Sequence, residues 1–428
     1  MGYCVELKTD NMRMDLWQQA EAHVAASQSL MRTRLVESDV PYTDVAYQVV
    51  DASVKAEMDY LDCSHLQLND EQIHQLVLQR IQRPWKIDGA LVSYQFLKTA
   101  ENVYWGVFSA HHILMDGVSF STHGKSMIEA YTRLCQNEEC PTYSDVFADY
   151  ITENREKFDT FEVLEYWRER FNNIVALDFP LPSRQLKEDD QGEINHEVEH
   201  VLEIQLWQEI KQYCKQNRSS PALFLKSIYG LLINNYCGAE SDFVVTEFSA
   251  GRSRQNLRAL GCYFQSIPFV FEQHLFDGDK SFIEICQYAR QFSKQLRTNQ
   301  FISDLAQKRL HPSSRLHFTY NYYHFLPTIE FEGEYARSRN YDPDLRGPVQ
   351  LVAALKDEGL YLKLIYLPSL FSDLDFLPRF ESLVKQILSG VERVGDLEFI
   401  LPQEKVILKQ HLLEAEEPRA IETIVDLF

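Results

Sequence analysis

The sequence predicts an α/β fold built as two lobes, and three observations lead to this expectation. The chain has 428 residues, a length that fits two to three compact units or two lobes that share one interface. Hydrophobic residues make up 45% of the chain and aromatic residues 12%, enough to bury sizeable cores. Runs with the two-residue period of strands alternate with runs of helical period in both halves.

In the first half, Leu16, Ala20 and Val24 recur at helical spacing. A second helical pattern covers 70–82, and a third follows Gly117. Ser119 is the expected N-cap of that third helix. Four segments rich in branched and aromatic residues are expected to form strands: 32–36, 47–50, 91–98 and 102–110.

In the second half, Ser220-Pro221 begins a helix that runs to about Tyr236 and is closed by Gly238. Strands are expected at 242–250 and 263–271.

The polar, proline-punctuated stretch 179–193 is the expected crossing between the lobes. A helix and then an acidic linker are expected from about Pro402 onward. We therefore assign 1–175 to an N-terminal lobe, 176–400 to a C-terminal lobe and 401–428 to a linker.

Charge and composition exclude several classes of function. The 63 acidic and 42 basic side chains give a formal net charge of -21, and no Lys/Arg block offsets it, so binding to nucleic acid is disfavoured. No apolar run approaches the roughly 20 residues of a membrane span. Without a signal peptide, we expect a soluble cytoplasmic protein with reduced thiols. The eight cysteines show no CxxC spacing, so no zinc site is expected either.

The sharpest local motif is His111-His112-Ile-Leu-Met-Asp116-Gly117, where an expected strand gives way to a helix. The strand fixes the backbone while the turn can open toward a cleft. Gly117 is expected to allow a backbone geometry that a side chain forbids. Asp116 is expected either to order the turn or to pair with a cation. Taken alone, such a histidine pair is equally well explained as a structural feature. No GxSxG elbow is present, which disfavours serine hydrolase chemistry.

The motif resembles the His-His-x-x-x-Asp-Gly signature of condensation domains of nonribosomal peptide synthetases, in the chloramphenicol-acetyltransferase-like superfamily. Other segments resemble further motifs of that family in the same order along the chain. They are SLMRTRL (29–35), RPWKIDGALV (83–92), YSDVFADY (143–150), EYWRERF (165–171), the segment 234–271 with its Ala-Gly-Arg, SRLHFTYNYY (314–323), and the linker-like 401–428 that leads toward an adenylation domain.

Two family features are altered. The helix with an SxAQxRLW-like motif is missing before the first strand, so we expect either a truncated sequence or another piece that supplies it. An HxxxPFE segment is degraded near residue 300.

The resemblance implies two chloramphenicol-acetyltransferase-like lobes that form a V-shaped pseudo-dimer with a central tunnel, with His112 at its centre. It implies an acyltransferase that forms an amide bond between a donor acyl or peptidyl thioester and an acceptor aminoacyl thioester. The resemblance further implies that upstream and downstream carrier domains present both substrates on 4'-phosphopantetheine, and that an adenylation domain adjoins. No intrinsic cofactor or metal is implied, because the thioester is already activated.

The resemblance also implies roles for individual residues. His112 is the catalytic residue, acting as a base or by hydrogen bonding to the reacting groups, and His111 supports the loop. Asp116 is structural, and because a buried carboxylate needs a partner, Arg252 is the candidate. The alternative for Arg252 is an exposed charge at a strand end. Asn321 lines the cavity or is an ordinary strand amide.

Two other functions fit the same motif. An epimerisation domain shares it but carries an EGHGR-like segment, where this chain has FSAGR at 248–252. A non-catalytic recruiting module of the same fold usually lacks the second histidine, whereas His112 is present. The identity of the donor and acceptor substrates does not follow from these motifs.

Overall fold

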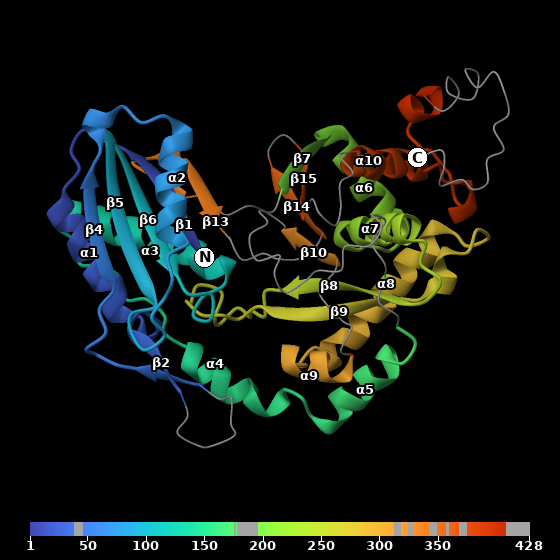
Figure 1. Ribbon diagram of the computed structural model, residues 1–428, viewed down its shortest axis with the longest axis horizontal. Coiled ribbons are helices and arrows are strands. Elements are labelled where there is room, and N and C mark those ends of the chain that lie inside the picture. The colour runs from blue at the N-terminus through green and yellow to red at the C-terminus, as the bar shows by residue number, and fades with distance from the viewer. Residues whose placement is uncertain are drawn as a thin grey trace, which may run out of the picture. The chain divides into compact units, whose positions relative to one another are not determined.

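The computed structural model describes residues 1–37, 46–174, 177, 196–311, 318–323, 329–341, 349–356, 359–367 and 375–407. The chain forms two compact units (Figure 1). Unit 1 comprises Met1–Thr160, Phe248–Ser266 and Leu326–Arg346, and unit 2 comprises Phe161–Glu247, Ile267–Phe325 and Gly347–Phe428. The expected crossing at 179–193 and most of the expected linker, from 408 onward, lie outside the described residues.

Unit 1 is built on a mixed sheet. In the described ranges its strand order is β13 (Ser338–Tyr341), β1 (Gly2–Lys8), β6 (Val103–Ala110), β5 (Val92–Ala100) and β4 (Glu57–Asp62). Neighbouring strands are antiparallel except β4 and β5, which are parallel and are joined through helix α2 (Asp70–Ile81). Such a connection is required because parallel neighbours cannot be linked by a tight turn.

Both faces of this sheet are covered by helices, α1 (Met14–Ser27) and α3 (Gly117–Cys135) on one face and α2 on the other (Figure 1). The strand sequences explain this arrangement, because successive side chains point to opposite faces. Tyr3 and Val5 of β1 belong to the core under α1 and α3, whereas Cys4 belongs to the core under α2.

Smaller elements complete unit 1. They are α4 (Phe147–Asn154), the strand pair β2 (Thr33–Glu37) with β3 (Ala46–Val50), the pair β11 (Ile329–Phe331) with β12 (Glu334–Ala336), and the 3₁₀ turns Ser29–Arg32, Ser64–Leu66 and Arg155–Lys157.

Unit 2 contains a second mixed sheet. In the described ranges its order is β7 (His196–Glu203), β15 (Gly359–Tyr366), β14 (Val349–Lys356), β10 (Phe318–Tyr323), β8 (Phe243–Ser249) and β9 (Gln265–Phe271). The last residues of β8 and the first of β9 are counted with unit 1. The helices of unit 2 are α5 (Phe161–Phe171), α6 (Ile204–Gln216), α7 (Pro221–Cys237), α8 (Phe282–Asn299), α9 (Asp304–Leu310) and α10 (Phe376–Leu388). Two 3₁₀ turns, Gln273–Phe276 and Val394–Asp396, and helical residues 402–407 complete it.

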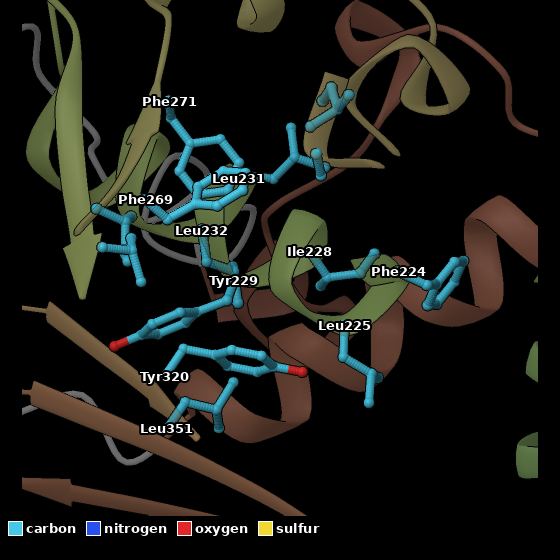
Figure 2. Close-up of a cluster of buried hydrophobic side chains, with 14 of the residues drawn as sticks. Phe224, Leu225, Ile228, Tyr229, Leu231, Leu232, Phe269, Phe271, Tyr320 and Leu351 are labelled. Atoms are coloured by element: carbon cyan, nitrogen blue, oxygen red, sulfur yellow. The ribbon is translucent and has the colours of Figure 1, made fainter. Parts of the chain in front are cut away.

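Helix α7 lies at the centre of the unit 2 core. Ten consecutive residues, from Phe224 to Ile233, are buried, so the helix is enclosed on all sides. Figure 2 shows its side chains among Phe269, Phe271 and Tyr320 of the adjacent strands. A helix that is apolar all round is stable only when it is surrounded by other elements.

Candidate active site

The histidine motif occupies the turn between β6 and α3, as the sequence predicts. His111 directly follows β6, and its backbone N–H donates to the carbonyl of Leu91 at 2.9 Å. Its imidazole Nδ1 accepts a hydrogen bond from the backbone N–H of Ile113 at 3.2 Å. Leu114 and Met115 are fully buried. The turn is therefore fixed by the hydrogen bonds of His111 and by the burial of the Leu114 and Met115 side chains.

His112 is half-buried, and its ring lies against Phe264 with the ring centroids 5.0 Å apart. Within the described ranges, the imidazole of His112 makes no hydrogen bond.

Asp116 is the residue that caps helix α3. Its Oδ1 accepts from the backbone N–H of Ser119 at 2.8 Å, and its Oδ2 accepts from the backbone N–H of Tyr263 at 3.0 Å. The expectation that Ser119 is the N-cap was wrong. Both residue types are good caps, but the chain turns helical at Gly117, which places the carboxylate of Asp116 over the free N–H groups.

Asp116 also forms the expected ion pair with Arg252. The Nη2 group of Arg252 lies 2.8 Å from Asp116 Oδ1, and the two side chains are 2% and 4% exposed respectively. The alternative of an exposed charge at a strand end does not hold for Arg252.

Arg252 lies near the start of the loop between β8 and β9 (250–264) and holds that loop in place. Its Nη1 donates to the carbonyls of Asn256 and Ala259 at 2.9 and 2.7 Å, and its Nη2 donates to Ser119 Oγ at 2.7 Å. Its guanidinium stacks on the ring of Tyr263 at 4.3 Å. Burial raises the pKa of Tyr263 to about 12, so its hydroxyl stays neutral beside this cation at neutral pH. The guanidinium therefore connects the loop to the histidine motif.

Ser119 and Gly261 make a second connection. The Ser119 hydroxyl donates to the Gly261 carbonyl at 2.6 Å and accepts from the Gly261 N–H at 3.0 Å. The loop is consequently bonded to the start of α3 at both of its ends.

Of two glycines near the site, only one stands where a side chain would not fit. Gly251 has φ +59°, and a Cβ there would collide with the carbonyl oxygen of Tyr263, so only glycine fits before Arg252. Gly117 does not have a positive φ, and a Cβ there would meet nothing within 4 Å. The expectation that Gly117 supplies a special backbone geometry was therefore wrong.

The structure gathers His111, His112, Asp116, Gly117 and Arg252 in unit 1. Asn321 lies in unit 2 on β10, where its side-chain N–H donates to the hydroxyl of Tyr323 at 2.7 Å.

Sequence reasoning missed the contributions of Tyr263, Phe264 and the Ser119 hydroxyl. Residues 263 and 264 were expected to lie in a strand, but β9 begins at Gln265. The only signal for these two residues is their position two and three residues after Gly261, in the segment that resembles a family motif.

The described residues hold neither a metal-binding cluster nor a membrane-spanning helix. No cluster of three or more His, Cys, Asp or Glu side chains there could hold a metal ion. The eight cysteines all lie in the described ranges, and none of them forms a disulfide. Among the helices of the described chain, none combines the length and apolar character that crossing a membrane demands.

Comparison with known proteins identifies the family and the fold. The sequence model of the family described as "Condensation domain" matches residues 3–405. The chain is 24% identical over 328 residues to bacitracin synthase 1 of Bacillus licheniformis, which covers 73% of this chain and 6% of that protein. It is 22% identical over 424 residues to N-(5-amino-5-carboxypentanoyl)-L-cysteinyl-D-valine synthase of Penicillium rubens, which covers 90% of this chain and 11% of that protein. The chain thus spans only a small part of the length of these relatives.

Solved structures share the fold at low sequence identity. The first condensation domain of the calcium-dependent antibiotic synthetase, bound to a substrate analogue, matches with a TM-score of 0.74 and 14% identity over 94% of this chain and 93% of that one. A four-domain nonribosomal peptide synthetase bound to AMP and glycine matches with a TM-score of 0.78 and 14% identity over 95% of this chain and 32% of that one. The predicted chloramphenicol-acetyltransferase-like α/β fold is confirmed, and with a family match across nearly all of its length the chain belongs to the condensation-domain family.

Proposed function

We propose that this chain is the condensation domain of a nonribosomal peptide synthetase that joins two carrier-bound building blocks through an amide bond. The observation that carries the proposal is the state of His112. Its turn is locked by the Asp116–Arg252 pair, while its imidazole makes no hydrogen bond within the described residues. An imidazole held by its backbone but left free at both nitrogens is suited to proton transfer or hydrogen bonding with a substrate.

The reaction needs one proton transfer. The α-amine of the acceptor attacks the carbonyl carbon of the donor thioester, a C–N bond forms, the C–S bond breaks, and the donor thiol leaves. The nitrogen loses one proton and the departing sulfur gains one. Because an α-amine has a pKa of about 7.7–8.0, an imidazole can accept its proton during attack. His112 acts in this step either as that base or as a hydrogen-bonding partner of the reacting groups.

The substrates are proposed to arrive on 4'-phosphopantetheine arms of an upstream donor and a downstream acceptor carrier domain, with an adenylation domain nearby. Support comes from the curated relatives, which are named as synthases of peptides, and from the similar structure of a four-domain synthetase. Tethering both substrates raises the effective concentration of one near the other and accounts for much of the rate. A synthetase with these partners is proposed to work in the cytoplasm.

The other two functions are less well supported. An epimerisation domain is disfavoured because Phe248 stands where such domains typically carry glutamate. A recruiting module without chemistry is disfavoured because His112 is intact.

A single reconstituted assay separates the three functions. The purified chain is incubated in deuterated buffer with a donor carrier and an acceptor carrier, each loaded in turn with the proteinogenic L-amino acids, and the carriers are analysed by mass spectrometry. Dipeptidyl acceptor carrier is the expected product. Deuterium at the α-carbon without a dipeptide would indicate epimerisation, and carrier binding without either product would indicate a recruiting module.

A further inference from the structure

Phe264 is the only side chain of the described residues whose ring lies against the imidazole of His112. The ring centroids are 5.0 Å apart and the planes are tilted by 43°. Phe264 is itself half-buried and also contacts the ring of Phe248, with the centroids 6.0 Å apart and the planes at 62°. His112 thus has an aromatic wall on one side.

The position of this wall is fixed by the same network that fixes the motif. Tyr263, directly before Phe264, donates its backbone N–H to Asp116 Oδ2 at 3.0 Å. Gln265, directly after it, begins β9. The backbone is therefore fixed both before and after Phe264. The hydrogen bond before it is made by Asp116, whose carboxylate also caps α3.

The imidazole of His112 otherwise has little to fix its orientation. A histidine side chain rotates about two bonds, and a hydrogen bond to one ring nitrogen usually selects its orientation. Here no such bond exists among the described residues. A tilted aromatic contact at this separation is favourable, so it favours the ring orientations of His112 that keep the contact with Phe264.

We propose that Phe264 is a positioning residue for His112, whose ring selects the imidazole orientation used in catalysis. The kinetic part of this inference rests on the proposed condensation activity, whereas the orientation of the ring can be observed without it. Phe264 does not touch the reacting atoms in this scheme and acts only through His112. Because small misplacements of a catalytic group lower rates by an order of magnitude or more, removal of the wall has a measurable cost.

The test compares three variants with the wild type. Phe264→Leu keeps an apolar side chain and removes the ring, and Phe264→Tyr keeps the ring. Tyr104→Leu is the matched control, because Tyr104 is also a half-buried aromatic residue of unit 1 but lies near the start of β6, at the far end of that strand from His112. Each protein is labelled at its 13 histidines, and the imidazole signal of His112 is assigned by its disappearance in His112→Gln.

Three results are expected together. In Phe264→Leu the His112 imidazole signal shifts and broadens, since the ring current and the orientational restraint are both lost. Its kcat falls about tenfold with KM nearly unchanged, because in this proposal Phe264 acts only through the orientation of His112. In Phe264→Tyr and Tyr104→Leu both the signal and kcat remain close to those of the wild type.

Other outcomes overturn the inference. An unmoved His112 signal in Phe264→Leu means that the ring does not set the imidazole orientation. A shifted signal with an unchanged kcat means that orientation has no catalytic consequence. If no variant, wild type included, condenses loaded carriers, the proposed function fails, and the signal of His112 alone still decides whether Phe264 positions the imidazole.

Discussion

Asp116 and Arg252 are 136 positions apart in the sequence, yet they form an ion pair of 2.8 Å whose side chains are almost wholly buried. Both charged groups also form hydrogen bonds with the backbone. The carboxylate accepts from two backbone N–H groups, and the guanidinium donates to two backbone carbonyls. The pair is therefore the point at which the histidine motif is attached to the loop after β8.

Breaking this pair is expected to destabilise the fold. Asp116→Asn leaves a buried guanidinium without its counter-charge, and Arg252→Ala leaves a buried carboxylate and two carbonyls without their partner. Each is expected to lower the free energy of unfolding by roughly 3–5 kcal/mol, measured by denaturant titration. Arg13→Ala is the matched control, because Arg13 and Asp15 form an exposed pair whose loss changes little. Losses in Asp116→Asn and Arg252→Ala as small as in that control would contradict a structural role.

Lys226 and Glu247 form a second ion pair, in unit 2, in which only the lysine is fully buried. Lys226 Nζ lies 2.6 Å from Glu247 Oε2, and the side chains are 2% and 23% exposed respectively. The ammonium also lies 3.7 Å from the centre of the Phe269 ring. Burial lowers the pKa of Lys226, and Glu247 opposes that shift.

This asymmetry predicts unequal effects of removing each partner. Lys226→Met places an apolar side chain in an apolar site, and the carboxylate of Glu247 can turn to solvent, so we expect a loss of about 1 kcal/mol or less. Glu247→Gln leaves a buried ammonium without a counter-charge, so we expect roughly 3 kcal/mol. In the double variant, Lys226→Met with Glu247→Gln, the loss in the free energy of unfolding should be close to that of Lys226→Met alone. A larger loss in Lys226→Met than in Glu247→Gln would refute the assignment of the ammonium as the buried partner.

Glu21 makes the stability of the folded state depend on pH. It is 5% exposed on α1, and its carboxylate accepts a hydrogen bond from Trp17 Nε1 at 2.8 Å. Burial raises the pKa of Glu21 from 4.5 to about 8, and the Trp17 bond only partly opposes this. Because the folded state holds the proton more tightly than the unfolded state, the stabilisation is complete below pH 4.5 and is lost as the pH rises to about 8.

The variant Glu21→Gln should remove that dependence. Its stability relative to the wild type is expected to increase by up to about 1.4 kcal/mol per pH unit as the pH rises from 6.5 toward 8. This window is chosen because the buried His123, whose pKa is lowered from 6.5 to about 3 by burial, stays neutral throughout it. Melting temperatures of both proteins across the window provide the measurement. A constant difference between them would show that Glu21 is ionised in the folded protein.

Much of the fold could be predicted because local signals and tertiary packing agree. The helix begun by Ser220-Pro221 and closed by Gly238 is present as Pro221–Cys237, with Gly238 in the left-handed conformation at φ 54°. The helix predicted at 70–82 is Asp70–Ile81, with an Asn69 capping box. Turn and cap residues act over a few positions, so the sequence reveals them directly.

The arrangement of the loop after Arg252 could not be predicted, because its bonds reach across the chain. Residues 263 and 264 have the composition of a strand, yet Tyr263 gives its N–H to Asp116 instead of to a neighbouring strand. Ser119 looks like a cap, yet its hydroxyl bonds to Gly261, 142 positions later. The contact of Phe264 with His112 likewise depends on tertiary structure that no local pattern encodes.

The role of His112 is the central claim, and the rate of amide formation by His112→Ala tests it most directly. Donor and acceptor carriers that support turnover by the wild type are supplied to the variant, and dipeptidyl carrier is quantified over time. His274→Ala, at an exposed histidine of unit 2, is the control and should retain the wild-type rate. We expect His112→Ala to keep the wild-type melting temperature and to lose about a hundredfold or more of the rate. A His112→Ala protein that condenses the same carriers at the wild-type rate would contradict the assignment of His112 as the catalytic residue.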